Sequence, residues 1–295
     1  MQKTIKRKLI SLKAVLPRVI LYAALIFFTL LVVVPVGWAV LNSLKRAAEF
    51  ASGKPWALPK SLYLANYASA WVGARMGDYF LNTVLLTALS LAILLIVSVP
   101  CAYVLSRFKF RGARILDLLI MAGIFINVNY NVIPLYTMVN GVGRFLRIRM
   151  LADNAVVVSL IYAGTSVSFS VYLLCGFFRT LSTAFEEAAK IDGCGDARML
   201  LTVVAPLIMP SVVIVLLFNF LKFWNEYLIA VTFLTTTAKW TLPIGLLDLM
   251  EVERLAGDRG RMFAGLTIML VPTVAFFIAV QDKLMKGMTL GGIKG

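Results

Sequence analysis

Residues 179–210 read RTLSTAFEEAAKIDGCGDARMLLTVVAPLIMP, and their charged first part separates two long apolar runs. The run before it is Ala155–Phe178, and the run that follows begins at Leu200 and reaches Leu221. Each matches the length of about 20 apolar residues that a helix needs to cross the hydrocarbon core of a bilayer. Lipid leaves exposed backbone groups unsatisfied, so a single span must be helical. The stretch therefore predicts two membrane helices joined by a polar connection.

Long apolar runs separated by polar connections recur along the whole chain. Its 295 residues are 61% hydrophobic with a mean hydropathy of +0.90, more than a soluble domain carries. We predict an all-α fold, a polytopic membrane protein with six transmembrane helices. The predicted spans are Val19–Leu41, Phe80–Leu105, Leu118–Val139, Ala155–Phe178, Leu200–Leu221 and Met262–Val280.

The amino-terminal end combines a basic stretch, Lys3 to Arg18, with the first apolar run. The run is too long for the apolar region of a secretory signal, and no small-residue cleavage site follows it. We expect it to be retained as a membrane helix. The predicted division of the chain is a basic cytoplasmic tail (1–18), a transmembrane domain (19–281) that contains a cytoplasmic loop (179–198), and a cytoplasmic carboxyl-terminal tail (282–295).

The orientation follows from the distribution of Lys and Arg, which favour the cytoplasmic side of a membrane. Sixteen of them fall in the two tails, in the short connection after the second span and in residues 179–198, and twelve fall in the opposite connections. This bias predicts both termini in the cytoplasm. It also accounts for the net charge of +15 without invoking nucleic acid.

The connection 179–198 has the signals of a short helix. Thr183 followed by Glu186 has the spacing of a capping box, and the acidic pair at 186 and 187 complements the positive end of a helix dipole. Gly193 suits the left-handed residue that closes a helix, and Asp196 is predicted to cap the next one. We expect a two-turn helix between glycine hinges.

Several function classes are disfavoured by residues that the sequence lacks. It has no His, which removes Ser-His-Asp and Cys-His catalysis and the commonest transition-metal ligand. Cys101, Cys175 and Cys194 are far apart, so we predict reduced structural cysteines and no metal site. No GxxxxGK[ST] phosphate loop is present. An enzyme embedded in the membrane would need paired carboxylates or histidines, and the spans hold almost none.

The run EAAKIDGCGDARMLLTVVAPLIMP (187–210) resembles the EAA signature of ABC importer permeases, and GFFRT (176–180) narrows the resemblance to the carbohydrate branch. Within that branch the chain is similar to the second permease of maltose-type importers. Further stretches agree with this family: YVLSRFKFRG (103–112), IPLY (133–136), WNEY (224–227) and GMTLGGIKG (287–295). One departure is Ala205, where the family usually has Leu before the proline, and it leaves the docking function in place.

The resemblance implies a transport subunit and no enzyme. Its partners would be a second homologous permease, two cytoplasmic ATPases and an extracytoplasmic solute-binding protein, in a bacterial cytoplasmic (inner) membrane. The chain itself would hold no cofactor, because ATP and Mg would bind to the ATPases. The short helix in 179–198 would be the coupling helix that docks into an ATPase and drives alternating access. The residues that the resemblance assigns to coupling are Glu186, Glu187, Ala188, Ala189, Asp192 and Gly193.

Polar residues inside apolar helices are the candidates for the substrate path, because they are costly in lipid unless they face a cavity or a partner. Interhelical hydrogen bonds are an equally good explanation for several of them. Lys222 and Glu226 are four residues apart and are predicted to pair on one helix face. The path candidates are Asn127, Asn129, Tyr130, Asn131, Asn219, Trp224 and Asn225.

The solute stays open at this point between a neutral sugar or oligosaccharide and an acidic saccharide or another polar solute. Arg144, Arg147 and Arg149, predicted to lie outside, make the acidic alternative conceivable. A structural or receptor-like membrane protein is a third possibility, and the segment 187–210 disfavours it.

Overall fold

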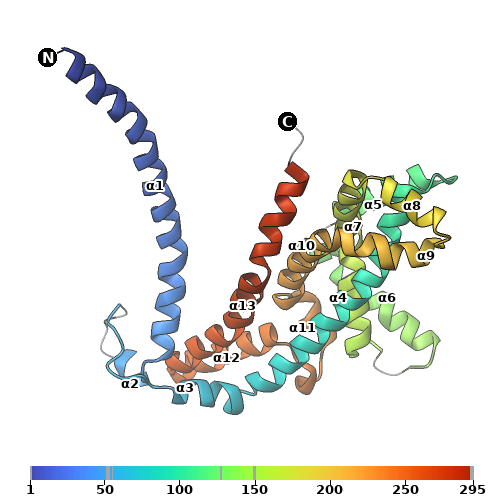
Figure 1. The fold of residues 1–295 in the computed structure, drawn as a ribbon. Coiled ribbons are helices and arrows are strands. Elements are labelled where there is room, and N and C mark those ends of the chain that lie inside the picture. The colour runs from blue at the N-terminus through green and yellow to red at the C-terminus, as the bar shows by residue number, and fades with distance from the viewer. Residues whose placement is uncertain (1, 51–53, 55, 127, 149–150, 293–295) are drawn as a thin grey trace. The chain divides into compact units, whose positions relative to one another are not determined.

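The structure is a computed structural model that describes residues 2–50, 54, 56–126, 128–148 and 151–292. The described residues form helices joined by turns and short connections, with no strand among them (Figure 1). The chain divides into two compact units. Unit 1 is Met1–Gly73 with Leu249–Thr267, and unit 2 is Ala74–Asp248 with Ile268–Gly295.

Unit 1 contains four helical elements and segments of two more. Its elements are α1 (Gln2–Ser43), α2 (Ala47–Phe50), α3 (Ala65–Ala68) and the π-turn η1 (Ser69–Gly73), together with parts of α12 (Leu242–Ala256) and α13 (Arg259–Gly292).

Unit 2 holds the remaining elements. They are α4 (Met76–Arg107), α5 (Ala113–Ile124), η2 (Val128–Asn131), α6 (Val132–Phe145), α7 (Ala155–Thr180), α8 (Ala184–Ile191), α9 (Asp196–Met199), the π-turn η3 (Leu200–Val204), α10 (Ala205–Trp224), α11 (Leu228–Phe233) and η4 (Thr237–Lys239).

Five of the predicted spans are confirmed as helices long and apolar enough to cross a membrane. The side chains of residues 16–36 are exposed in the isolated chain, as expected where lipid or a partner covers them, whereas the Ala155–Thr180 and Asp196–Trp224 segments are partly buried against the rest of the chain. The five segments are Leu16–Ser43, Met76–Arg107, Ala155–Thr180, Asp196–Trp224 and Arg259–Asp282.

The third predicted span, Leu118–Val139, is wrong as a continuous helix. It is divided between α5, with 12 residues, and α6, with 14, and the backbone is not α-helical between them. The sequence at the break is NVNYN (127–131), and asparagine favours turns because its side chain competes for backbone hydrogen bonds. Each half is roughly 20 Å long, too short to cross a core of about 30 Å alone.

The two central helices of unit 2, α4 and α7, run parallel. Near their starts the Ser159 hydroxyl donates to the Leu86 carbonyl (3.4 Å), and near their ends the Cys175 thiol lies against the Ala102 carbonyl (3.6 Å). Both pairs are separated by 73 residues, so the two helices advance together. The connection between them must therefore return from the end of α4 to the start of α7. We call the end of unit 2 where α4 and α7 finish the α8 end, and the opposite end the far end.

α10 runs antiparallel to α7. Asn219, which is buried, donates from its amide to Ser170 Oγ (3.0 Å), and Lys222 Nζ donates to Ser166 Oγ (2.8 Å). The hydroxyls of α7 thus serve contacts between helices, which is the usual use of small polar residues in membrane bundles. α10 returns the chain from the α8 end to the far end.

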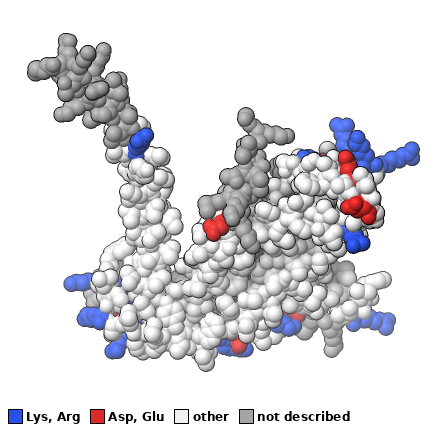
Figure 2. Space-filling model, viewed as in Figure 1, with Lys and Arg blue, Asp and Glu red and all other residues white. Residues whose placement is uncertain are grey.

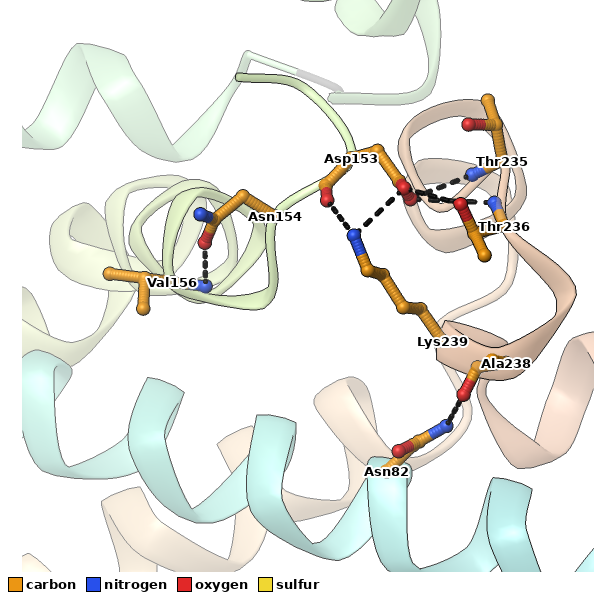
Figure 3. A network of polar contacts seen from close by, with 8 residues as sticks. All are labelled: Asn82, Asp153, Asn154, Val156, Thr235, Thr236, Ala238 and Lys239. Atoms are coloured by element: carbon orange, nitrogen blue, oxygen red, sulfur yellow. Dashed lines mark hydrogen bonds and ion pairs between the residues drawn. The ribbon is translucent and has the colours of Figure 1, made fainter. Parts of the chain in front are cut away.

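Polar contacts at the far end join two connections and link one of them to α4 (Figure 3). The Asp153 carboxylate accepts from the Thr236 hydroxyl (2.6 Å), from the Thr235 amide (3.1 Å) and from Lys239 Nζ (2.9 Å). The Asn82 amide group of α4 donates to the Ala238 carbonyl (2.8 Å). Burial works to raise the pKa of Asp153, but the Thr236 and Lys239 hydrogen bonds and the charge of Lys239 hold it below its ordinary value.

Unit 1 is organised around a buried amide. Asn66 donates to the carbonyls of Ser43 and Lys45, both at 2.8 Å, and so ties α3 to the end of α1. The Phe263 ring packs edge-on against Trp38 at 5.2 Å between centroids. The apolar body of α1 is exposed along its length, which suits a span that lipid surrounds.

Candidate coupling site

The helix predicted within 179–198 is α8, with eight residues. It lies at the same end of unit 2 as the last turns of α4 and α7 (Figure 1). The predicted capping box at Thr183 is wrong. Thr183 is itself helical and its side chain caps nothing, while the Ser182 hydroxyl accepts a hydrogen bond from the Ala184 amide (3.3 Å).

Glu186 is turned inward instead of back toward the start of its helix. Its carboxylate accepts a hydrogen bond from Nε of Arg107 at 2.7 Å, and both side chains are about nine-tenths buried. Nη2 of Arg107 also donates to the carbonyl of Leu181 (2.8 Å). Removing one member of a buried ion pair is costly because the other charge stays buried, so this contact ties α8 firmly to the end of α4.

The carboxyl end of α8 closes as the sequence predicts. Gly193 has φ +77°, a left-handed conformation that glycine adopts without a side-chain clash. Its amide donates to the Lys190 carbonyl (3.0 Å), and the Cys194 amide donates to the Ala189 carbonyl (2.9 Å). These two bonds are the pattern of a Schellman motif.

The prediction for the following helix is partly wrong. Gly195 and not Asp196 occupies the N-cap position of α9, and no side chain caps it. The chain then passes through the π-turn η3, in which the Ala205 amide donates to the Leu200 carbonyl. Pro206, which has no amide hydrogen, sits in the first turn of α10, where that hydrogen is not needed.

The two faces of α8 differ in what they meet. Glu186 and Ala189 are buried against their own chain, so Ala189 is not free to meet a partner. Glu187, Ala188, Asp192 and Gly193 are exposed.

Two exposed apolar residues on α8 were not among the predicted site residues: Phe185 (49% exposed) and Ile191 (87%). Phe185 and Ile191 each lie three residues from Ala188 in the sequence. This helical spacing places all three residues on one face of the helix and could have predicted the apolar face. On the view in Figure 2, charged side chains of both signs also gather at the α8 end. An apolar stripe with charges beside it is typical of a docking surface.

Three of the four path candidates of the third span lie at the break between α5 and α6. Asn127 falls outside the described residues, and Asn129 lies in η2. Tyr130 is 84% exposed, and Asn131, also exposed, immediately precedes α6. Irregular backbone at membrane depth occurs where protein buries it or where it borders a water-filled cavity.

The path candidates of the fifth span separate by burial. Asn219 and Trp224 are buried, and the indole of Trp224 donates to the Met269 carbonyl (3.1 Å), so both hold helices together. Asn225 is exposed, with its amide on the Leu221 carbonyl (2.8 Å).

The predicted pair of Lys222 and Glu226 is wrong. α10 ends at Trp224, so the two residues do not share a helix face. The Glu226 carboxylate accepts from the Tyr162 hydroxyl (2.7 Å) and from the amides of Ile229 (2.8 Å) and Ala230 (3.0 Å). It therefore caps the start of α11.

Comparison with known proteins gives a consistent set of relatives. A family model described as "binding-protein-dependent transport system inner membrane component" matches residues 69–289. The diacetylchitobiose uptake system permease protein NgcG of Streptomyces coelicolor is 32% identical over 270 residues, which cover 92% of this chain and 87% of that protein. The sulfoquinovosyl glycerol transport system permease protein SmoH of Agrobacterium fabrum is 31% identical, covering 88% of each.

A solved structure has a similar fold. It is a chain of a bacterial ABC transporter involved in the import of the acidic polysaccharide alginate, and it matches with a TM-score of 0.75 over 90% of this chain and 95% of its own. The two sequences are 24% identical, so this likeness concerns the fold.

Proposed function

Because the chain belongs to the family of binding-protein-dependent transport system inner membrane components, we propose that it is the permease subunit of an ATP-driven importer for a sugar or oligosaccharide. The observation that carries this proposal is the exposed face of α8, at the end of unit 2 where α4 and α7 finish. The relatives that transport diacetylchitobiose and melibiose, raffinose or stachyose support a saccharide as the solute.

The proposal includes six membrane crossings. Five are single helices, and α5 with α6 forms the sixth as a broken span. The parallel course of α4 and α7 supports this count, because the chain must cross back between the end of one and the start of the other. With the α8 end in the cytoplasm, as the distribution of basic residues favours, both termini are cytoplasmic.

In this proposal α8 is the coupling helix. Its exposed face, formed by Phe185, Ala188 and Ile191, enters a cleft of a cytoplasmic ATPase, and Glu187 pairs with a basic group there. Asp192 and Gly193 form the turn on which the helix pivots. ATP and Mg bind to two such ATPases and not to this chain.

Movement of α8 reaches the membrane through its buried face. Glu186 holds the end of α4 through Arg107, and Ala189 belongs to the same apolar cluster as Met199 and Tyr103. Rigid-body displacement of α8 as the ATPases close would therefore move α4 with it. Together with a second permease this gives alternating access for a solute that a binding protein delivers.

The substrate path is proposed to pass the broken span. The sequence between α5 and α6 includes Asn127, Asn129, Tyr130 and Asn131, whose amide and phenol groups suit sugar hydroxyls, and Asn225 is exposed directly after α10. Broken helices with their ends at mid-membrane are the recurrent way in which transporters build a binding site.

The coupling proposal is tested by reversing one exposed charge. In proteoliposomes that hold the assembled transporter, Glu187→Lys should reduce the ATPase stimulation by loaded binding protein roughly tenfold, because a repulsive charge then faces the partner. Glu251→Lys, an equal reversal at an exposed position of α12, should leave stimulation unchanged. Equal stimulation in wild type and Glu187→Lys would remove the role of this face in coupling.

An acidic saccharide is the second candidate solute. The 31% identical relative that transports sulfoquinovosyl glycerol carries a solute with a sulfonate group, which supports this alternative. Uptake of neutral and acidic sugars compared in the same vesicles separates the two.

A further inference from the structure

Lys222 is a cation inside a segment that is long and apolar enough to span a membrane. Its ammonium group donates to Ser166 Oγ (2.8 Å) and to the Thr165 carbonyl (3.3 Å). Among the described residues it forms no ion pair, since Glu226 is engaged by Tyr162 and by the start of α11. A charged residue within a span is expensive in lipid and marks a functional site by default.

Snorkelling to the headgroups does not explain this lysine. Ser166 is the twelfth residue of α7, roughly 16 Å along the helix from its first residue, Ala155. The offset of 73 residues between α7 and α4 places Ser166 level with Ile93, near the middle of α4. The ammonium is thus drawn inward to mid-helix and not outward to the interface.

Exposed aromatic and amide side chains lie within one turn of Lys222 and Thr165 along their helices. Phe218 of α10 is exposed one turn before Lys222, and Asn225, the exposed C-cap residue that follows α10, comes three residues after it. On α7, Phe169 follows Thr165 by one turn, and its ring meets Phe218 edge-on at 5.9 Å. Aromatic rings cover the apolar faces of pyranose rings, and amide groups bond their hydroxyls.

The positive charge of Lys222 favours a solute with a negative charge, which a neutral sugar lacks. An ammonium group has three donors, and all of its printed bonds go to neutral oxygens: Ser166 Oγ (2.8 Å), the Thr165 carbonyl (3.3 Å) and, at the longest distance, Thr165 Oγ1 (3.5 Å). Because none of these acceptors carries a charge and the described residues offer the ammonium no ion pair, its positive charge is available to an anionic solute. A carboxylate in this position would form a charge-assisted hydrogen bond, which is about twice as strong as a neutral one.

We propose that Lys222, with Phe169, Phe218 and Asn225, forms a subsite on the translocation path that binds the anionic group of an acidic saccharide. This inference rests on the proposed importer function and narrows its solute class. Thr165 and Ser166 position the ammonium, and the aromatic pair holds the adjoining sugar ring.

The test measures equilibrium binding of two radiolabelled probes, tetragalacturonate and maltotetraose, to the assembled transporter in nanodiscs without ATP and at constant ionic strength. Wild type should bind the acidic probe at least tenfold more tightly than the neutral one. Lys222→Met should lose this ratio, and Lys222→Arg should keep most of it. Lys60→Met, a matched loss of charge in the connection before α3, should behave as wild type.

A second measurement asks whether the position faces water. In a background with Cys101, Cys175 and Cys194 replaced, Lys222→Cys should react with a membrane-impermeant methanethiosulfonate in the assembled transporter. Reaction in the single chain but not in the assembly would place the lysine in a dry contact between permeases and overturn the subsite.

Equal binding of both probes by wild type, or an unchanged ratio in Lys222→Met, would also overturn the subsite while binding-protein-stimulated ATPase activity persists. Failure of the importer function itself would appear differently, as wild-type transporter without any stimulated ATPase activity.

Discussion

The two ends of unit 2 satisfy their charged groups in different ways. At the far end, Asp153 is held by Thr235, Thr236 and Lys239, all from one distant connection, so the chain completes the cluster by itself (Figure 3). At the α8 end, the Arg107–Glu186 pair is complete, but the opposite face of the same short helix leaves Phe185 and Ile191 uncovered.

This difference separates a closed connection from an incomplete surface. A network satisfied within the chain favours one arrangement of its loops. A short helix fixed on one face and apolar on the other is poorly stable alone, since isolated helices of this length are marginal in water. We therefore expect a partner to cover the exposed face of α8, whereas the contacts at the far end hold its loops together within the chain.

The largest effect is expected from breaking the buried pair. Arg107→Met leaves the Glu186 carboxylate buried without its cation, which typically costs about 3–5 kcal/mol. We expect a lower apparent melting temperature in detergent and faster amide exchange in α8, with the remaining spans protected. Hydrogen exchange measured by mass spectrometry distinguishes the exchange of the α8 amides from that of the membrane spans.

A double variant sharpens this prediction. Arg107→Met with Glu186→Gln removes both charges, so it should recover most of the lost stability. Stimulated ATPase activity should stay low in both variants, because α8 is no longer tied to α4. Recovery of stimulation together with stability would mean that the pair holds the fold and transmits nothing.

Most of the fold could be predicted from hydropathy, and the exception is instructive. Five apolar runs became five helices, because window hydropathy reports the need to satisfy backbone groups in lipid. The run 118–139 has the same hydropathy signal, yet it contains a break. Hydropathy cannot see local competition by asparagine side chains, although the NVNYN sequence carried that information.

The site was predictable where it depended on backbone chemistry. Gly193 closes α8 in the expected left-handed conformation. The role of Glu186 was not predictable, because its partner is 79 residues away and local spacing suggested a capping box instead. The predicted ion pair of Lys222 and Glu226 was wrong for the same reason, because each side chain bonds to a residue of α7 instead. Local rules lose where tertiary contacts supply a stronger bond.

A smaller effect is expected from the uncovered face of α8. Burying one large apolar side chain at an interface contributes about 2 kcal/mol, roughly 30-fold in affinity. Ile191→Ser and Phe185→Ser should each weaken retention of the ATPase subunit by about that factor, measured by titration in nanodiscs. Phe145→Ser, at an equally exposed aromatic of the far end, is the matched control and should retain the ATPase fully. Equal loss in all three would show that surface apolarity in general, and not this face, governs assembly.

The smallest effect concerns the closed network at the far end and depends on pH. Because the folded pKa of Asp153 lies below its ordinary value of 3.8, its stabilisation is present above that pH and is lost as the pH falls through the folded pKa. Asp153→Asn should cost about 1.5 kcal/mol near neutral pH, the usual worth of a hydrogen bond to a charged group. The melting temperatures of the two proteins should draw together only below pH 3.8 and converge once the pH has fallen through the folded pKa. A difference in melting temperature that persists in acid would assign the stabilisation to packing of the loops and not to the charge of Asp153. The far end would then no longer differ from the α8 end in being held together by charged groups of its own chain.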